Sequence, residues 1–191
     1  MWRAAKACHS ISNTIDSKDS RKKEWIFKGV EFVTEAVNIT DANFDVLKWA
    51  AILIGESTDF LSSSGKIKQG QLFKEYLDKA IALKPMEYTL LHMRGRYFYS
   101  IANLSWLERK LVNTLCPSIT ATIDDALNDF LKVNVLIDNL LFLARCLISK
   151  NDKKRAMMYL TRASHLTPKN EAENQVLKEV NDLLTRYKLN C

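Results

Sequence analysis

Histidine and cysteine are the side chains best suited to bind metals or act as nucleophiles, and this chain has few of them. They are His9, His92, His165, Cys8, Cys116, Cys146 and Cys191. No CxxC pair occurs, and no histidine has ligand spacing to another histidine or to a cysteine. Cys8 and His9 are adjacent, and neighbours on a helix do not face one site. The sequence therefore predicts no metal site.

The motifs of common enzymes and phosphate-binding loops are also missing. The sequence contains no GxSxG, no HExxH and no Gly-rich phosphate loop. Gly65-Lys-Ile-Lys-Gln-Gly70 lacks the residue order of a P-loop, and a basic turn explains it better. Asp124 and Asp125 begin a predicted helix, where carboxylates complement the helix dipole. We expect no catalytic residues, no cofactor and no enzymatic activity.

Two arginines have the chemistry to hold an anion, because a guanidinium binds a carboxylate or phosphate through two parallel hydrogen bonds. Arg96 follows Leu91 by five residues, and Arg145 follows Leu140 by five, so both occupy equivalent places in two predicted helices. The predicted partner-binding groove is lined by His92, Arg96, Tyr99, Leu141, Arg145 and Ile148. The alternative is that each arginine pairs with a neighbouring carboxylate or lies in solvent.

The composition favours helices as the elements that position these side chains. Of 191 residues, 47% are apolar and 26% charged, and there are only 5 glycines and 3 prolines for turns. Apolar residues recur at helical spacing along nearly the whole chain. The predicted helices cover 1–12, 21–38, 43–63, 71–83, 87–103, 105 to before 117, 122 to about 135, 140–149, 153–166 and 170 to about 187.

Several helix ends have local signals. Ser105-Trp-Leu-Glu108 has the form of a capping box, and Thr122-Ile-Asp-Asp125 begins the next helix in a similar way. Asn170 and Glu173 are suited to cap the last helix. Ser62-Ser63-Ser64-Gly65 is predicted to end the third helix.

Three segments share the spacing of the second helix of a tetratricopeptide (TPR) repeat. They are Phe73, Leu77 and Ala80; Ala126, Phe130 and Val133; and Ala156, Leu160 and Ala163. The segment 103–121 interrupts one repeat. We predict an all-α, antiparallel helical stack, a TPR-like α-solenoid of about nine or ten helices. It forms one domain over 1–191, with irregular repeats at about 43–85, 86–137 and 138–168 and a capping helix over 170–188.

The formal net charge of +6 favours an acidic partner: an acidic protein surface, an anionic membrane or nucleic acid. The nucleic-acid interpretation depends on charge alone, because no recognition motif supports it, and no nucleic-acid partner is expected. A second candidate docking surface is a basic patch of Lys66, Lys68, Arg109 and Lys110.

Several motifs together resemble the regulator of microtubule dynamics family. They are Phe73-Lys-Glu-Tyr-Leu-Asp-Lys-Ala-Ile-Ala-Leu-Lys-Pro85, Gly95-Arg-Tyr, Leu104-Ser-Trp-Leu-Glu-Arg-Lys110, Asp124-Asp-Ala-Leu127 and the start with Trp2-Arg3. The resemblance implies a TPR-like adaptor of microtubules and the mitotic spindle that contributes to chromosome segregation, with tubulin or another acidic protein segment as partner.

The resemblance also implies a second function, because one relative is credited with phospholipid binding at organelle contacts. In that alternative, Leu141, Ile148 and Ile54 would line a lipid tunnel. The sequence has no run of 18 apolar residues and no secretory signal, so we expect no membrane span and a location in the reducing cytoplasm. The resemblance further implies a place on the cytoskeleton, the spindle and the spindle poles. Cys146 is expected to be a small core residue.

Overall fold

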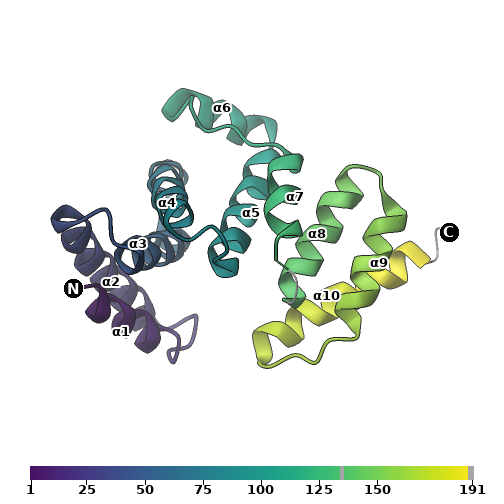
Figure 1. The fold of residues 1–191 in the computed structure, drawn as a ribbon, viewed down its shortest axis with the longest axis horizontal. Helices are drawn as coiled ribbons and strands as arrows, with labels where there is room; N and C mark the ends of the chain where they lie inside the picture. Colours follow the sequence, from purple (N-terminus) through teal and green to yellow (C-terminus); the bar gives the residue numbers. More distant parts are fainter. Residues whose placement is uncertain (134–135, 189–191) are drawn as a thin grey trace. The chain divides into compact units, whose positions relative to one another are not determined.

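The helices begin where side chains satisfy the unpaired amides of the first turn. A computed structural model describes residues 1–133 and 136–188 (Figure 1). The Glu108 carboxylate accepts a hydrogen bond from the Ser105 amide at 2.8 Å, and the Ser105 hydroxyl accepts one from the Glu108 amide at 3.4 Å. Thr122 and Asp125 form the same reciprocal pair. Both predicted capping boxes are confirmed.

The all-α prediction is also confirmed. Within the described residues the chain forms ten α-helices, one short 3-10 turn and no strand. The elements are α1 (Trp2–Ser12), α2 (Ser20–Ile39), α3 (Phe44–Ser57), η1 (Thr58–Phe60), α4 (Ser63–Leu83), α5 (Tyr88–Ala102), α6 (Trp106–Leu115), α7 (Ile123–Leu131), α8 (Ile137–Ser149), α9 (Lys153–Ser164) and α10 (Glu171–Lys188). None of them is long and apolar enough to cross a membrane.

Three predicted boundaries differ from the structure. The segment 62–65 begins α4 instead of ending the preceding helix, because Ser62 is the extended N-cap residue and Gly65 lies in the first turn. Lys66 and Lys68 are therefore helical, and the predicted basic turn is wrong. α8 begins at Ile137, three residues before the predicted start at 140. α7 ends at Leu131, and its predicted end near residue 135 lies outside the described residues.

The chain packs as two compact units, and each is described by itself. The first unit contains residues 1–90 and 104–119. In it α1, α2, α3 and α4 pack on one another in chain order, and α6 packs on α4. Leu47, Leu53 and Leu77 are completely buried in its core. Gly29 permits a close approach, since a Cβ added there would lie 2.8 Å from the Leu53 side chain.

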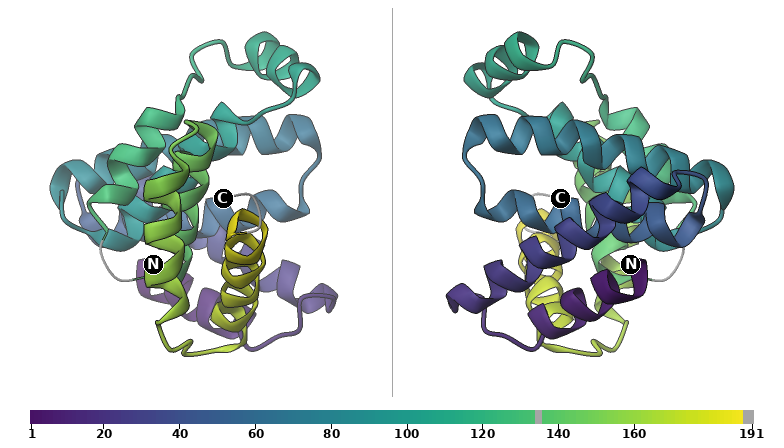
Figure 2. Two further views of the ribbon diagram at one scale, coloured as in Figure 1. Left: turned by 90° about the vertical axis from the view of Figure 1, so that its right-hand side faces the viewer. Right: turned by 90° about the vertical axis from the view of Figure 1, so that its left-hand side faces the viewer.

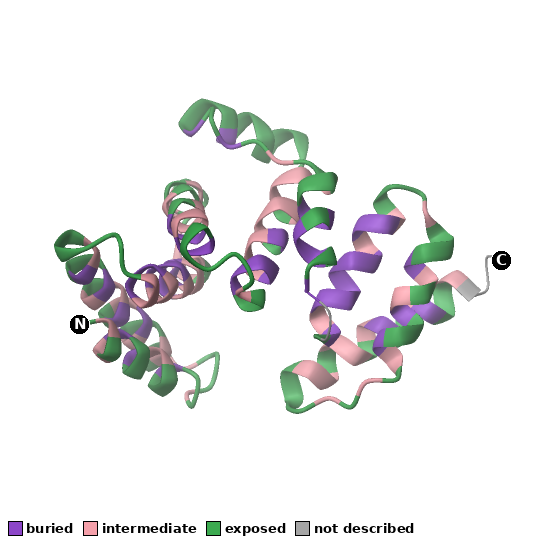
Figure 3. Ribbon diagram, viewed as in Figure 1, coloured by how far each residue is buried: buried purple, intermediate pink, exposed green. Residues whose placement is uncertain are grey.

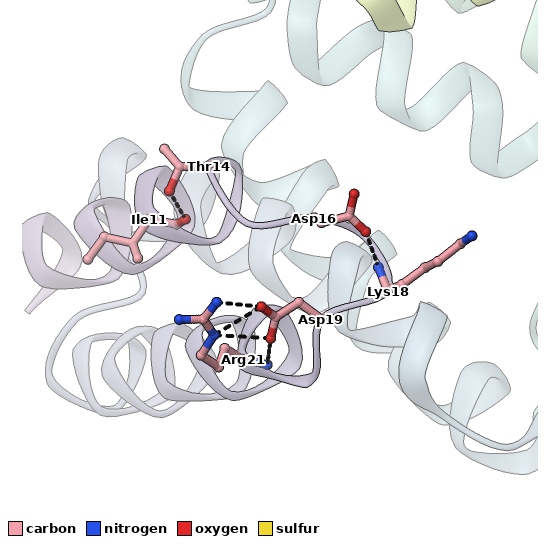
Figure 4. A network of polar contacts seen from close by, with 6 residues as sticks. All are labelled: Ile11, Thr14, Asp16, Lys18, Asp19 and Arg21. Atoms are coloured by element: carbon pink, nitrogen blue, oxygen red, sulfur yellow. Dashed lines mark hydrogen bonds and ion pairs between the residues drawn. The ribbon is translucent and has the colours of Figure 1, made fainter.

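Polar contacts at the surface of the first unit shape the turn between α1 and α2 (Figure 4). Asp19 is the N-cap residue of α2 and accepts a hydrogen bond from the Arg21 amide at 2.9 Å. The Arg21 guanidinium forms three further contacts with the same carboxylate, at 2.6 Å from Nη2 and at 3.0 and 3.1 Å from Nε. The hydrogen bonds from Arg21 hold the pKa of Asp19 below its usual range. This ion pair is exposed.

The second unit contains residues 91–103 and the described residues from Thr120 onward. α8 packs on α7 and α9, and α10 packs on both α8 and α9, as two directions of view show (Figures 1 and 2). α8 contributes most of the core and is buried along much of its length (Figure 3). Phe130 of α7 and Val180 of α10 are completely buried against it.

Residues of the predicted repeat pattern lie in these cores. Leu77 and Ala80 of α4 are fully buried, and so are Ala126 of α7 and Leu160 of α9. The pattern thus marks the packing faces of the three helices. The division into repeats at 43–85, 86–137 and 138–168 and the single-domain boundary stay predictions.

Candidate partner-binding surfaces

Phe142, which is absent from the predicted groove set, is the residue around which four of the predicted residues gather. The Arg96 and Arg145 guanidinium carbons lie 5.0 and 4.8 Å from the centre of its ring. The rings of Tyr99 and His92 meet it edge-on, with centroids 5.4 and 6.2 Å away. We call these five residues the Phe142 cluster.

Helical geometry explains why these side chains meet. Residues at i, i+4 and i+7 share one face of a helix, and α5 and α8 each contribute such a row. The rows are His92, Arg96 and Tyr99 on α5, and Asp138, Phe142 and Arg145 on α8. The same spacing was available in the sequence as a signal for Asp138 and Phe142, but an apolar residue at helical spacing usually indicates core.

His92 is a buried structural residue of this cluster. Its exposed fraction is 8%, and its two ring nitrogens lie 3.0 Å from Asn139 Oδ1 and 3.0 Å from Asp138 Oδ2. The Asn139 amide donates to the carbonyls of Phe130 at 2.9 Å and Val133 at 2.8 Å. These bonds join α5 to the connection between α7 and α8.

Asp138 is the carboxylate that the cations of the cluster share. Burial by itself raises the pKa of Asp138, but the hydrogen bond from His92 and the positive charges of His92, Arg96 and Arg145 outweigh burial. The pKa therefore lies below its ordinary value, and Asp138 stays ionised at neutral pH. Arg96 Nη1 contacts Asp138 Oδ2 at 3.4 Å.

Both arginines of the predicted groove have an internal carboxylate partner. Arg96 contacts Asp138, and the Arg145 guanidinium pairs with Glu179 of α10. This arrangement is the alternative to a ligand-binding role that the sequence left open. The side chain of Arg96 nevertheless stays 55% exposed, compared with 28% for Arg145, so Arg96 is the more accessible of the two. Their role as anion ligands stays a prediction.

The apolar residues of the predicted groove lie deeper than expected. Leu141 is 1% exposed and belongs to the core of the second unit, whereas Ile148 is partly buried against the same core. Ile54 is also 1% exposed, in the first unit. A lipid tunnel requires apolar side chains that the core does not use, so Leu141 and Ile54 do not fit that role.

The predicted basic patch lies on two helices of the first unit. Lys66 and Lys68 are exposed on α4, and Arg109 and Lys110 are exposed on α6. The Lys110 ammonium lies 5.5 Å from the centre of the Trp106 ring. The patch is therefore accessible, and its function stays a prediction.

A second basic surface, which is not among the predicted residues, lies on α9. This helix carries Lys153, Lys154, Arg155 and Arg162 and no acidic residue. The run from Lys153 to Arg155 is visible in the sequence, but charge runs usually indicate only a solvated helix face. The structure adds that the three side chains of the run are exposed.

The three cysteines among the described residues, Cys8, Cys116 and Cys146, are buried. Burial, and to a lesser extent the negative charge of Asp124, raises the pKa of the Cys146 thiol to about 12. Burial also raises the pKa of Cys8. Both are therefore thiols at neutral pH, and thiols are poor nucleophiles. Among the described residues no three His, Cys, Asp or Glu side chains gather as a metal site.

Comparison with known proteins assigns the chain to a family. Residues 1–188 match the family model described as "Regulator of microtubule dynamics protein 1-3". The chain is 38% identical over 191 residues to "Regulator of microtubule dynamics protein 1" of Caenorhabditis elegans, an alignment that covers 97% of this chain and 84% of the relative. It is 31% identical over 194 residues to "Regulator of microtubule dynamics protein 2" of Homo sapiens, covering 98% of this chain and 47% of the relative.

The chain covers different shares of its relatives, which limits how much of their function can be assigned to it. "Regulator of microtubule dynamics protein 3" of Xenopus laevis is 37% identical over 151 residues, covering 78% of this chain and 32% of the relative. The chain thus spans less than half of these two vertebrate relatives but most of the nematode one. The match over 1–188 nevertheless includes every described helix, and the chain belongs to the regulator of microtubule dynamics family.

Proposed function

We propose that this chain is a non-enzymatic scaffold that binds microtubules and spindle components in the cytoplasm and contributes to chromosome segregation. The observation that carries the proposal is the family match over residues 1–188, together with relatives named as regulators of microtubule dynamics. The formal net charge of +6 supports an acidic binding partner. The acidic tails of tubulin have that chemistry.

The geometry of the Phe142 cluster supports a scaffold more than an enzyme. Its titratable groups are engaged with one another: His92 contacts Asp138 and Asn139, and Arg145 pairs with Glu179. A general acid or base needs a free position beside its substrate. These contacts join α5, α8 and α10, so we assign the cluster a mainly structural role.

We also propose that the scaffold is TPR-like. In that arrangement, a small residue of a first helix lies against a large residue of a second helix. Gly95 of α5 and Phe130 of α7 fit this description, because a Cβ at Gly95 would lie 2.6 Å from the Phe130 ring. Stacked repeats of this kind present extended surfaces that bind partners.

Co-sedimentation with microtubules over a salt series tests the proposed function. The purified chain should pellet with intact microtubules at low salt. It should be lost from the pellet as salt rises, because screening weakens contacts between exposed charges. Microtubules whose acidic tails have been removed by proteolysis should retain little of it. Absence from the pellet even at low salt would contradict direct microtubule binding by this chain.

A further inference from the structure

One helix of the second unit, α9, carries only positive charge. α9 has four basic residues and no acidic one, in a chain whose formal net charge is +6. The neighbouring helices α7 and α10 begin with acidic residues in their first turns, Asp124 and Asp125 in one and Glu171 and Glu173 in the other. Of the four helices that lie wholly in the second unit, α7, α8 and α10 contain acidic residues and α9 contains none.

Three of the four cations of α9 are placed against the helix dipole. Lys153, Lys154 and Arg155 occupy the first turn, where the positive end of the dipole disfavours cations, whereas Arg162 lies in the last turn, which favours them. Asp152, the N-cap residue, offsets part of this cost: it accepts a hydrogen bond from the Arg155 amide at 3.1 Å, and its carboxylate lies 3.5 Å from Arg155 Nη1. Charge placed against the dipole therefore needs another reason, and the exposed face of the helix offers one.

The exposed face of α9 has a regular layout. Ala156, Leu160 and Ala163 are buried, so the opposite side of the helix faces outward (Figure 3). A shallow hollow lies on that side, lined by Asp152, Lys154, Arg155, Met157, Met158 and Thr161. Met158 is 56% exposed.

The spacing of the cations on this face suits an extended chain. Arg155 and Arg162 are two helical turns apart, which places them about 10 Å from each other along the helix. Three residues of an extended polypeptide span about the same distance. A segment rich in glutamate or aspartate therefore offers a carboxylate at each position, and Lys154, the residue before Arg155, lines the hollow as well.

The same face fits other anionic partners less well. A helix that inserts into a membrane surface needs a broad apolar face, and here Met158 is the exposed large apolar side chain of α9. Single-stranded nucleic acid is usually held by aromatic side chains on which the bases stack. The hollow is lined by charged residues, two methionines and a threonine, without an aromatic ring.

We propose that the outward face of α9, formed by Lys154, Arg155, Met158, Thr161 and Arg162, is the docking site for an extended acidic polypeptide segment. The charged side chains contact carboxylates, and Met158 contacts the apolar part of the bound chain. The proposal rests on the proposed function in one respect: it assigns the contact with acidic tubulin tails to this helix. The same docking site would also bind any other partner that has an extended acidic segment.

A matched pair of variants tests the site. K154Q/R155Q removes one lysine and one arginine from α9, and R3Q/K6Q removes one arginine and one lysine from α1, which belongs to neither candidate docking surface. All four side chains are exposed. Each exposed ion pair contributes up to about fivefold in affinity when the contact is well formed. We expect K154Q/R155Q to weaken microtubule pelleting about tenfold and R3Q/K6Q to weaken it less than about twofold.

A direct binding measurement separates this proposal from the function on which it rests. A synthetic glutamate-rich peptide is titrated into the full chain carrying ¹³C-methyl methionine. The methyl signal of Met158 should move, and those of Met1 and Met86 should not, although these three residues are similarly exposed at 56%, 56% and 62%. Anionic vesicles and single-stranded RNA, added separately, should leave the methyl signal of Met158 unchanged.

The outcomes are distinguishable. If the wild-type chain does not pellet with microtubules but the peptide shifts the methyl signal of Met158, the proposed microtubule function is wrong and the proposed docking site is supported. If the wild type pellets and K154Q/R155Q pellets equally well, the docking site is wrong and the function stands. An unmoved Met158 with peptide, or a response only to vesicles or RNA, also overturns the site.

Discussion

The first unit places a bidentate arginine–aspartate pair at its surface, and the second unit places one in its interior. Arg21 and Asp19 lie in solvent, with side-chain exposures of 72% and 28%. Arg94 Nε and Nη2 contact the Asp129 carboxylate at 2.7 and 2.9 Å, and Asp129 is only 3% exposed. The chemistry of the two pairs is the same, so they differ mainly in depth.

The connections between helices give a reason for this difference. In the first unit, α3 leads to α4 through η1 and a short turn, so the chain itself keeps the two helices together. In the second unit, α6 and its flanking loops separate α5 from α7 in sequence. Arg94–Asp129 joins α5 to α7 directly, and His92–Asn139 joins α5 to the start of α8. Buried polar contacts thus hold α5 against α7 and α8, which no short turn connects to it.

The ion pairs give the comparison with the largest expected effect. Arg94→Gln leaves the buried Asp129 carboxylate without its main partner, which should lower the free energy of unfolding by about 3 to 5 kcal/mol. Arg21→Gln breaks an exposed pair and should leave it unchanged within error. Urea unfolding followed by circular dichroism measures both. Equal effects of the two substitutions would show that depth does not distinguish the units.

Two asparagines give the next comparison. Asn139 is completely buried and makes three hydrogen bonds, so Asn139→Ala should cost about 3 kcal/mol by leaving buried carbonyls unpaired. Asn43 caps α3 at the surface, and Asn43→Ala should cost about 1 kcal/mol. Thermal melts of both variants test whether Asn139→Ala lowers the melting temperature more than Asn43→Ala does. Asn139→Asp is the shape control, because it keeps the oxygen that faces His92 but loses the two donated bonds.

Alanine substitutions at two glycines, Gly95 and Gly55, should give a smaller difference in the free energy of unfolding. A Cβ at Gly95 would lie 2.6 Å from the ring of Phe130, which is completely buried and stacked on Phe142, so Gly95→Ala should cost about 1 to 3 kcal/mol.

A Cβ at Gly55 would lie 2.8 Å from Phe73, which, unlike the completely buried Phe130, is only partly buried. There the gain in helix propensity, up to about 1 kcal/mol, should leave Gly55→Ala neutral or stabilising. Differential scanning calorimetry of the two alanine variants shows whether Gly95→Ala destabilises the chain more than Gly55→Ala does. A loss at Gly55 as large as at Gly95 would mean that both units pack equally tightly.

Much of the fold was predictable from the sequence because the relevant signals are local. Ser105 with Glu108 and Thr122 with Asp125 lie within one helical turn, so their capping bonds follow from spacing alone. The start of α4 was not predictable in this way. Ser62 and Gly65 are of types that end one helix as readily as they begin another, and only packing decides between them.

The candidate site was less predictable because its partners are distant in sequence. The helical period places Arg96 and Arg145 at equivalent positions, but it carries no information about Glu179, which lies 34 residues after Arg145. His92 was expected on an open wall, and Asn139 and Asp138, 47 and 46 residues later, enclose it instead. Periodicity indicates which face of a helix is apolar, whereas tertiary contacts determine which polar residues lie beneath the surface.

The pH dependence of stability gives the last and smallest comparison. Because the folded-state pKa of Asp138 is lower than the ordinary value of 3.8, the folded state favours the ionised carboxylate. Its stabilising contribution is therefore complete above about pH 3.8 and is lost as the pH falls through the lower folded-state pKa. Asp138→Asn should cost about 1 kcal/mol at pH 7, and its difference from the wild type should shrink toward acid.

Asp19 of the first unit is the matched control, because its pKa is lowered by Arg21 in the same direction. Its ion pair is exposed, however, so salt should screen the pH dependence of Asp19→Asn much more than that of Asp138→Asn. Urea titrations from pH 3 to pH 7, at low and high salt, measure both. If high salt removes the two pH dependences to the same extent, the charges around Asp138 are solvated like those at the surface, and the contrast in depth does not extend to the Phe142 cluster.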